Sequence, residues 1–264
     1  MPPRRFTDEQ EIELGKLYLS GVSTREIARR LNLPGKDSIL GALRRRGIEQ
    51  RSPSERNRLY SLNPNVFDII NNEHVAYWWG YLWADGYVHR RSLIVSTKDK
   101  DCEIAENIKV FMESNSPTKH YIHKIGEKSY PTCFIEFTDQ HLVDSLKLLG
   151  VTTGRPSIIP ILMYLPDNLT NHWIRGYFDG DGSATKSRCI SFCGDRKLLN
   201  WIREVASDKC GTNPGLSVHK HRTANLHYLS FSWKNPSLSL VEFMYNGATI
   251  WLKRKRERID EWVK

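Results

Sequence analysis

The sequence predicts an α+β protein in which a small all-α domain precedes two pseudo-twofold αββαββα repeats. Three observations support this: a motif that recurs after 96 residues, the same order of helix-like and strand-like segments behind each copy, and three short helical segments ahead of the first copy. The expected boundaries are residues 1–49 for the helical domain, 50–72 for a linker, 73–165 for the first repeat and 166–264 for the second.

The composition is that of an ordinary globular protein and excludes several classes. Of 264 residues, 39% are hydrophobic and 26% charged, which argues against extensive disorder. No apolar run approaches the ~18 residues of a transmembrane helix, and the basic N-terminus lacks the apolar core of a secretory signal. Five cysteines, without a Cys-x-x-Cys pair, argue against a disulfide framework and a cysteine-rich zinc site. We therefore expect a cytoplasmic protein with no membrane partner.

The charge points to a polyanion as the partner. Lysine and arginine number 39 against 30 acidic residues, a net charge of +9, and such an excess on a globular chain is typical of nucleic-acid binding. Between residues 24 and 60 there are ten basic and four acidic residues, and a second basic cluster covers residues 253–256. The middle of the chain is closer to neutral.

The first sixty residues predict three short helices. Thr7 and Gln10 have the spacing of a capping box at the start of the first helix. Ser23 or Thr24 caps the second helix, and the third covers Asp37–Arg46. A polar linker follows.

Residues 21–33, with the sequence GVSTREIARRLNL, resemble the core of a helix-turn-helix module. In such modules the later helix enters the major groove of DNA, and its N-terminal residues meet the base edges. The resemblance assigns base contacts to Lys36, Asp37 and Ser38, and phosphate contacts to Arg44, Arg45 and Arg46. Arg51, in the linker, is expected to follow a groove. A small helical bundle with a solvated basic face, or a protein adaptor, remains the alternative.

The repeated motif reads AYWWGYLWADG at residues 76–86 and HWIRGYFDGDG at residues 172–182. Each copy is followed by an apolar helical stripe, strand-like segments and a closing helix, near residues 142–149 and 238–245. Small residues recur four positions apart in both motifs, at Gly80 and Ala84 and at Gly176 and Gly180. Each helical glycine costs about 1 kcal/mol relative to alanine, so close packing of the two helices is the expected compensation. The four tryptophans in or beside the motifs are expected in the core.

Such packing brings Asp85 and Asp181 together at two helix C-termini, and a left-handed Gly86 and Gly182 are expected to end the helices. Two neighbouring carboxylates at the negative ends of helix dipoles repel each other. A divalent cation removes this conflict, and oxygen ligands suit Mg²⁺. The alternative is that each aspartate only caps a turn.

The two motifs, GYLWADG and GYFDGDG, resemble those of a single-chain LAGLIDADG homing endonuclease, and the resemblance covers Glu73–Lys264. It implies the fold of that family and cleavage of double-stranded DNA by a monomer. The implied product is a double-strand break with short 3′ overhangs at a long, nearly asymmetric site. The implied cofactor is Mg²⁺ or Mn²⁺, with Ca²⁺ binding without cleavage.

The resemblance also implies the site residues. One acid per repeat, Asp85 and Asp181, binds metal with help from the preceding carbonyl groups of Ala84 and Gly180. A basic residue after each repeat's last helix corresponds to Arg155 and Lys255. Arginine stays protonated, which limits Arg155 to charge stabilisation. Lys98, behind a strand, is a further catalytic candidate, whereas Asp179 is not, because the first motif has Trp83 there. A solvated last helix remains the alternative for residues 253–258.

Two strand-like segments have a polar and basic face that suits the major groove. The expected DNA contacts on them are Lys119, Tyr121, His123, His219 and His221. A plain solvent-exposed sheet face remains possible for both. Two other functions also use this fold, a transcription regulator with an inactive site and an RNA-splicing cofactor. The retention of both aspartates argues against the first, and the helix-turn-helix against the second.

Overall fold

The computed structural model describes residues 6–20, 22–32, 37–51, 60–152, 159–212, 214–221, 224–232 and 234–262. The chain divides into two compact units, Met1–Leu59 and Tyr60–Lys264. In the described ranges, no helix combines the length and apolar character that a membrane crossing requires.

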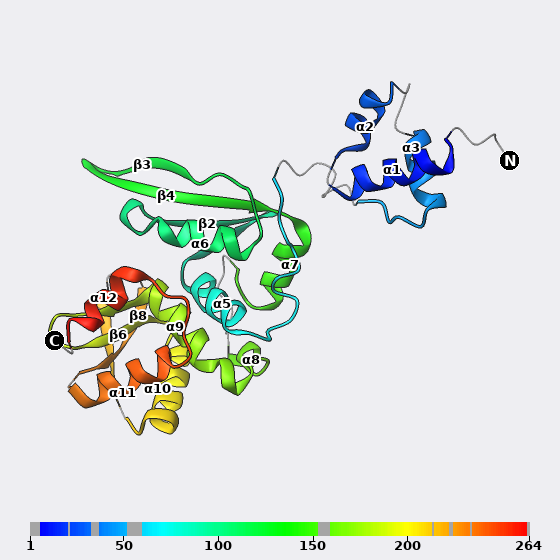
Figure 1. The fold of residues 1–264 in the computed structure, drawn as a ribbon. Coiled ribbons are helices and arrows are strands. Elements are labelled where there is room, and N and C mark those ends of the chain that lie inside the picture. The colour runs from blue at the N-terminus through cyan, green and yellow to red at the C-terminus, as the bar shows by residue number, and fades with distance from the viewer. Residues whose placement is uncertain are drawn as a thin grey trace. The chain divides into compact units, whose positions relative to one another are not determined.

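The first unit contains α1 (Asp8–Leu19), α2 (Thr24–Arg30) and α3 (Asp37–Arg45) (Figure 1). The capping box of Thr7 and Gln10 is present, and Ser23 caps α2. Apolar residues of all three helices form a small separate core that includes Leu14, Ile27 and Ile39. Helix α3 ends at Arg45, one residue before the predicted end at Arg46.

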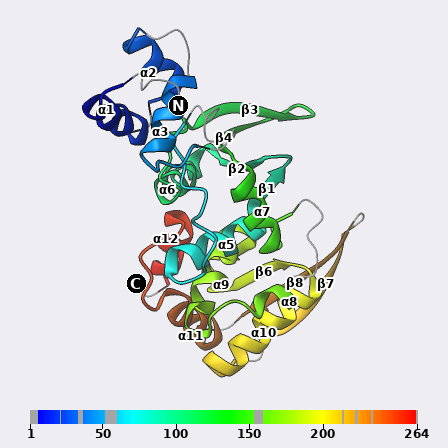
Figure 2. The same cartoon turned by 90° about the vertical axis from the view of Figure 1, so that its right-hand side faces the viewer.

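The second unit contains the two predicted repeats (Figure 1, Figure 2). The first comprises α5 (Glu73–Asp85), β1 (Gly86–His89), β2 (Ser92–Lys98), α6 (Glu103–Phe111), β3 (Lys119–Ile125), β4 (Lys128–Thr138) and α7 (Gln140–Leu148). The second comprises α9 (Thr170–Asp181), β5 (Gly182–Ala184), β6 (Ile190–Gly194), α10 (Arg196–Cys210), β7 (Gly215–His221), β8 (Ala224–Phe231) and α11 (Lys234–Tyr245). The additional helices are η1 (Asp99–Asp101), α8 (Ile159–Leu162), η2 (Asp167–Leu169) and α12 (Lys253–Asp260). The predicted order of elements is confirmed in both repeats.

The two sheets have the same antiparallel topology. Their strand orders are β1-β2-β4-β3 and β5-β6-β8-β7, so the second is the first with each number raised by four. In the first sheet, Cys133 of β4 lies opposite both Thr97 of β2 and His120 of β3. The β3–β4 hairpin extends as a long arm (Figure 1).

The core of the second unit is built around α5 and α9, which lie side by side (Figure 2). Trp78, Trp79 and Trp173 are completely buried, and the rings of the last two meet edge to face at 6.0 Å. The prediction that the motif tryptophans belong to the core is confirmed. An ion pair also joins the helices, because Arg175 Nη2 of α9 lies 2.7 Å from Glu73 Oε1 of α5.

Two expectations differ from the structure. Residues 60–72, expected in the linker, belong to the second unit, where Phe67 is 2% exposed and contacts Phe111 with ring centroids 5.5 Å apart. The apolar residues Val66, Phe67, Ile69 and Ile70, directly after the polar residues 50–65, are the sequence signal that the linker ends before residue 72. Cys102 and Cys133 form a disulfide, although the cysteine count argued against one. They meet because the start of α6 packs against β4, a long-range contact.

Candidate active site

Glycines allow the backbones of α5 and α9 to touch. A Cβ atom at Gly80 would overlap the carbonyl oxygen of Trp173, and a Cβ atom at Gly176 would overlap that of Tyr77. Backbone atoms cannot move aside as a flexible side chain can. The cost of helical glycine is therefore offset by a helix contact that no larger residue allows.

This contact brings the two motif aspartates to the same end of the helix pair. Asp85 is the last residue of α5 and Asp181 the last of α9. A Cβ atom at Gly180 would lie 3.6 Å from Cγ of Asp85, so the Asp85 carboxyl lies beside the end of α9. Asp85 is exposed and Asp181 half-buried, which leaves both accessible to a ligand.

The helix ends differ from the expectation. Gly86 and Gly182 have φ values of −76° and −96° in extended backbone, not the left-handed conformation. They are glycines for lack of space, because a Cβ atom would meet Leu82 or Phe178 in the last turn of the same helix. The chain therefore passes from the last turn of each helix directly into the next strand, β1 or β5. This constrained turn fixes the position of the aspartate that precedes it.

Lys255 of α12 is buried at this end of α9, with 5% of its surface exposed. Its Nζ donates to the carbonyl oxygens of Phe178 (2.6 Å), Asp179 (2.9 Å) and Gly182 (2.6 Å), and the carbonyl oxygen of Gly180 lies 3.4 Å away. Burial lowers the pKa of the Lys255 ammonium to about 8, against the opposing effect of the Asp179 carboxylate. The predicted catalytic lysine therefore reaches the site and holds the backbone on both sides of Asp181.

Asp179 holds the segment that carries Lys255, a role the sequence analysis did not identify. Its Oδ2 accepts hydrogen bonds from the Leu252 backbone N–H (2.7 Å) and the Tyr77 hydroxyl (2.9 Å). Burial raises its pKa to about 6, although nearby Lys255 lowers it. The available signal was the spacing of Arg175 and Asp179, four positions apart, which places two charged side chains on one face of α9.

We expect Asp179→Asn to change the pH dependence of stability. The carboxyl pKa rises on folding from 3.8 to about 6, so its contribution to stability is complete below pH 4 and is lost as the pH rises through 6. Relative to the variant, the wild type should lose up to about 3 kcal/mol of unfolding free energy over this interval. Urea unfolding at pH 4 and pH 7 measures the difference. Asp144→Asn, an exposed control, should show no such change, and equal pH profiles for Asp179→Asn and the wild type would contradict the assignment.

Positive charge surrounds a cavity of about 430 Å³ beside the helix ends. Its lining includes Lys98, Lys100, Gly180, Arg254, Lys255 and Arg258. Lys98 and Lys255, predicted separately from the two repeats, thus meet at one cavity. Arg254 Nε also pairs with Asp101 Oδ1 at 2.9 Å. An oxyanion such as a phosphate is the ligand that this lining suits.

The donor set fits a hard divalent cation. Two carboxylates lie at helix C-termini, where the dipoles add negative charge, and the adjacent backbone offers the carbonyl groups of Ala84 and Gly180. Of the four carbonyl oxygens near Lys255, that of Gly180 lies farthest from the ammonium group. It therefore forms the weakest hydrogen bond to Lys255 and is the most readily available to a metal ion. The residues present therefore suit Mg²⁺ chemically.

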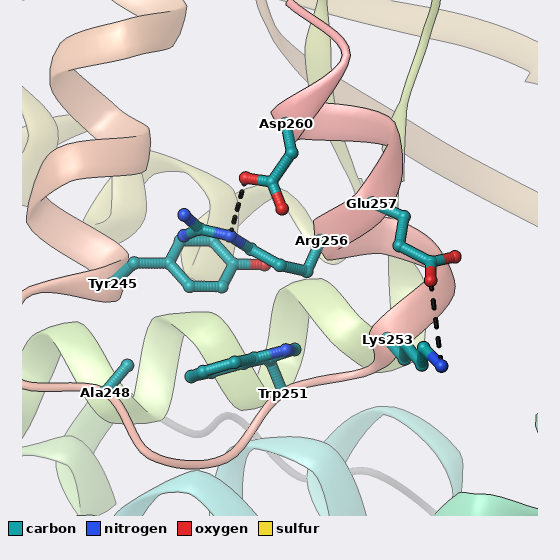
Figure 3. Close-up of a pocket in the computed structure, with 7 residues that line it drawn as sticks. All are labelled: Tyr245, Ala248, Trp251, Lys253, Arg256, Glu257 and Asp260. Atoms are coloured by element: carbon teal, nitrogen blue, oxygen red, sulfur yellow. Dashed lines mark ion pairs between the residues drawn. The ribbon is translucent and has the colours of Figure 1, made fainter. Parts of the chain in front are cut away.

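A second cavity, of about 420 Å³, lies against the other side of α12 (Figure 3). Arg256 lies over the ring of Tyr245, with the guanidinium carbon 4.5 Å from the ring centroid. Its Nε pairs with Asp260 at 2.9 Å, and Lys253 pairs with Glu257 at 3.8 Å. Both ion pairs lie within α12, so the contact of Arg256 with Tyr245 of α11 is what joins the helix that carries Lys255 to its neighbour.

The predicted contacts on β3 share an exposed face. Lys119 Nζ lies 5.6 Å from the ring centroid of Phe134, which the Tyr121 ring meets edge to face at 5.4 Å. The His123 ring lies 6.4 Å from that of Tyr121. His219 and His221 occupy β7, with side chains outside the described set, and Arg155 and Lys36 lie outside the described residues altogether.

In the first unit, several predicted DNA contacts have internal partners. Arg45 Nε donates to Glu11 Oε1 at 2.9 Å, and Arg46 pairs with both Asp8 (2.7 Å) and Glu11 (3.2 Å). The hydrogen bond from Arg45 lowers the pKa of the Glu11 carboxyl, which burial opposes. These ion pairs join α3 to α1.

The other predicted contacts of this unit differ in their exposure. Arg51 stacks over Tyr18, 4.3 Å from the ring centroid, and so belongs to the packing of the unit. Arg44 and Asp37 are exposed, whereas Ser38 is half-buried.

Known structures support the fold assignment. No family model matches the chain, and no curated protein matches it. The homing endonuclease I-WcaI bound to its DNA recognition sequence is similar in structure, with a TM-score of 0.54 and 14% identity, over 72% of this chain and 87% of that one. I-DmoI in complex with DNA and Ca is similar with a TM-score of 0.51 and 15% identity, over 75% and 99%. The second unit thus has the LAGLIDADG homing endonuclease fold, as the sequence predicted.

Proposed function

We propose that the protein is a site-specific endonuclease of the homing type that hydrolyses both strands of double-stranded DNA. The observation that carries this is the position of Asp85 beside the end of α9, where Asp181 and a basic cavity meet. The same fold binds DNA in I-WcaI and in I-DmoI. The proposal includes action as a monomer, in the cytoplasm, and short 3′ overhangs in the product.

Each residue of the site has a separate task in this proposal. Asp85 and Asp181 hold the divalent ion, with the carbonyl groups of Ala84 and Gly180 as further ligands. When bound there, Mg²⁺ or Mn²⁺ would supply activation of water and stabilisation of the leaving oxygen of the phosphodiester. Lys98 and Arg254 neutralise the phosphate that enters the basic cavity, and Lys255 keeps the Asp181 backbone in place. Ca²⁺ is expected to support binding without cleavage.

Cleavage of a plasmid library with a randomised insert tests the proposal. We expect double-strand breaks in Mg²⁺ or Mn²⁺ at one recoverable site, and protection of that site without cutting in Ca²⁺. Sequencing the ends gives the overhang. Tight binding to a recoverable site with no cutting in any of the three metals would contradict nuclease activity and favour a transcription regulator. Preference for structured RNA over duplex DNA would favour a splicing cofactor.

We further propose that the first unit lengthens the DNA footprint through phosphate contacts. Arg44 is exposed at the end of α3, whereas Arg45 and Arg46 hold α1. Each phosphate contact contributes about one unit to the slope of log affinity against log salt concentration. Arg44→Ala is therefore expected to lower the slope by about one for duplexes of any sequence. Fluorescence anisotropy over a series of salt concentrations measures the slope. Arg44→Lys, which keeps the charge, should retain it. An unchanged slope in Arg44→Ala would show that Arg44 does not contact a phosphate.

A further inference from the structure

Three potential metal ligands, none of them a motif aspartate, converge within the first repeat. One imidazole nitrogen of His120 and the sulfur atoms of Cys102 and Cys133 all lie within 4.8 Å of one another. They come from the start of α6, from β3 and from β4, and His120 is the cross-strand neighbour of Cys133. Cys133 is buried, Cys102 half-buried and His120 exposed, so the cluster opens to solvent on one side.

A carboxylate orients the imidazole. Nδ1 of His120 lies 2.6 Å from Oδ1 of Asp99, in the short helix η1. Donation of the Nδ1 hydrogen to this carboxylate leaves Nε2 with its lone pair available. Histidines that bind metals regularly donate their other ring N–H to a carboxylate in this way, which fixes the tautomer and raises the basicity of the ligating nitrogen.

We propose that Cys102, His120 and Cys133 bind a zinc ion when the two cysteines are reduced. Thiolate and imidazole are the ligands that zinc prefers, and two thiolates neutralise its charge in a partly buried place. Zinc binds thiolate at about 2.3 Å and imidazole at about 2.0–2.1 Å in a tetrahedral arrangement, so two ligand atoms of one site lie about 3.5–3.8 Å apart. Once the bond between the two sulfur atoms is reduced, they must separate to the ~3.8 Å that two thiolates on a tetrahedral zinc ion require, and water completes the tetrahedron on the exposed side.

The zinc form and the disulfide form exclude each other, because the sulfur atoms of a disulfide are not thiolates. Two molecules of an external thiol reduce the Cys102–Cys133 bond and become joined by a disulfide of their own, which leaves two cysteine thiols that lose their protons to the solvent when zinc binds. This site differs in kind from the one at Asp85 and Asp181, which offers only oxygen ligands. Zinc here would tie the start of α6 to the β3–β4 hairpin, whichever ion serves catalysis.

The proposal is tested on the full chain, reduced with a phosphine under anaerobic conditions and stripped of metal. We expect one equivalent of zinc per chain, measured by elemental analysis after gel filtration. Cobalt as a substitute should give thiolate-to-metal charge-transfer absorption in the near ultraviolet. Both signals should be lost in Cys102→Ser and retained in Cys210→Ser, a control from α10.

Variants of His120 and of its carboxylate partner give a stricter comparison. His120→Asn should weaken zinc binding, and His123→Asn, on the same exposed strand, should not. Asp99→Asn should weaken it by about 10- to 100-fold, as measured in competition with a chromophoric chelator. Zinc should raise the melting temperature of reduced wild type but not of Cys102→Ser. Absence of stoichiometric zinc from reduced wild type, or equal affinity in His120→Asn, would overturn the proposal, and circular dichroism checks that each variant is folded.

Discussion

Asp181→Asn is expected to lower the rate of metal-dependent cleavage by at least about 100-fold, because loss of a charge that acts on the transition state typically costs that much. Asparagine has the size of aspartate and keeps an acceptor oxygen, so the α5–α9 contact should persist. Asp85→Asn should have a similar effect, since Asp85 lies against the end of α9. Single-turnover cleavage of a plasmid that carries the recovered site measures both rates.

Affinity for the uncut site in Ca²⁺ separates catalysis from folding and binding. It should stay within a few-fold of the wild type in both variants. Asp208→Asn, an exposed acid on α10, is the matched control and should cut at the wild-type rate. If either motif variant cut at the wild-type rate, that aspartate would not belong to the active site, and the proposed metal-dependent mechanism would be wrong.

Gly176→Ala is expected to destabilise the second unit by about 3 kcal/mol or more, the upper part of the range for overpacked cores. The added methyl group would overlap the Tyr77 carbonyl oxygen, so α5 and α9 must separate. This outweighs the gain of about 1 kcal/mol in helix propensity that alanine brings. Urea unfolding followed by tryptophan fluorescence measures the change, because the motif tryptophans lie in this core.

A second helical glycine provides the control. At Gly41 of α3 the nearest atom to an added Cβ is an Arg45 side-chain nitrogen at 3.6 Å, an ordinary contact. Gly41→Ala should therefore stabilise the first unit by up to about 1 kcal/mol. If Gly176→Ala were as stable as the wild type, the backbone contact would not be the reason for glycine in the motif.

The repeat made most of the second unit predictable, because two copies of one pattern support each other at every element. Caps such as that of Thr7 were predictable as well, since they depend on residues three positions apart. The environment of Lys255 was not, because its acceptors are carbonyl groups about 75 residues away. Every residue has a backbone carbonyl group, so the sequence does not indicate which of them accept a hydrogen bond from a distant side chain.

The remaining differences have a similar cause. Phe67 lies just after the polar residues 50–65, and its role as an anchor depends on Phe111, which packs against it from 44 residues away in sequence. Cys102 and Cys133 lie 31 residues apart in sequence, and only the packing of α6 on the sheet joins them. Gly86 and Gly182 were correctly located at helix ends, but the constraint is steric contact with the last turn and not a positive φ.

The buried ion pair between α5 and α9 limits how this protein can be recombined with relatives. Arg175 contributes the cation from one repeat and Glu73 the anion from the other, and Glu73 also accepts from the Thr249 backbone at 2.6 Å. A chimera that keeps only one partner buries a charge without its counterion, at a cost of about 3–5 kcal/mol. Exchange of one repeat for that of a relative therefore requires that Glu73, Arg175 and the segment around Thr249 between α11 and α12 be matched together.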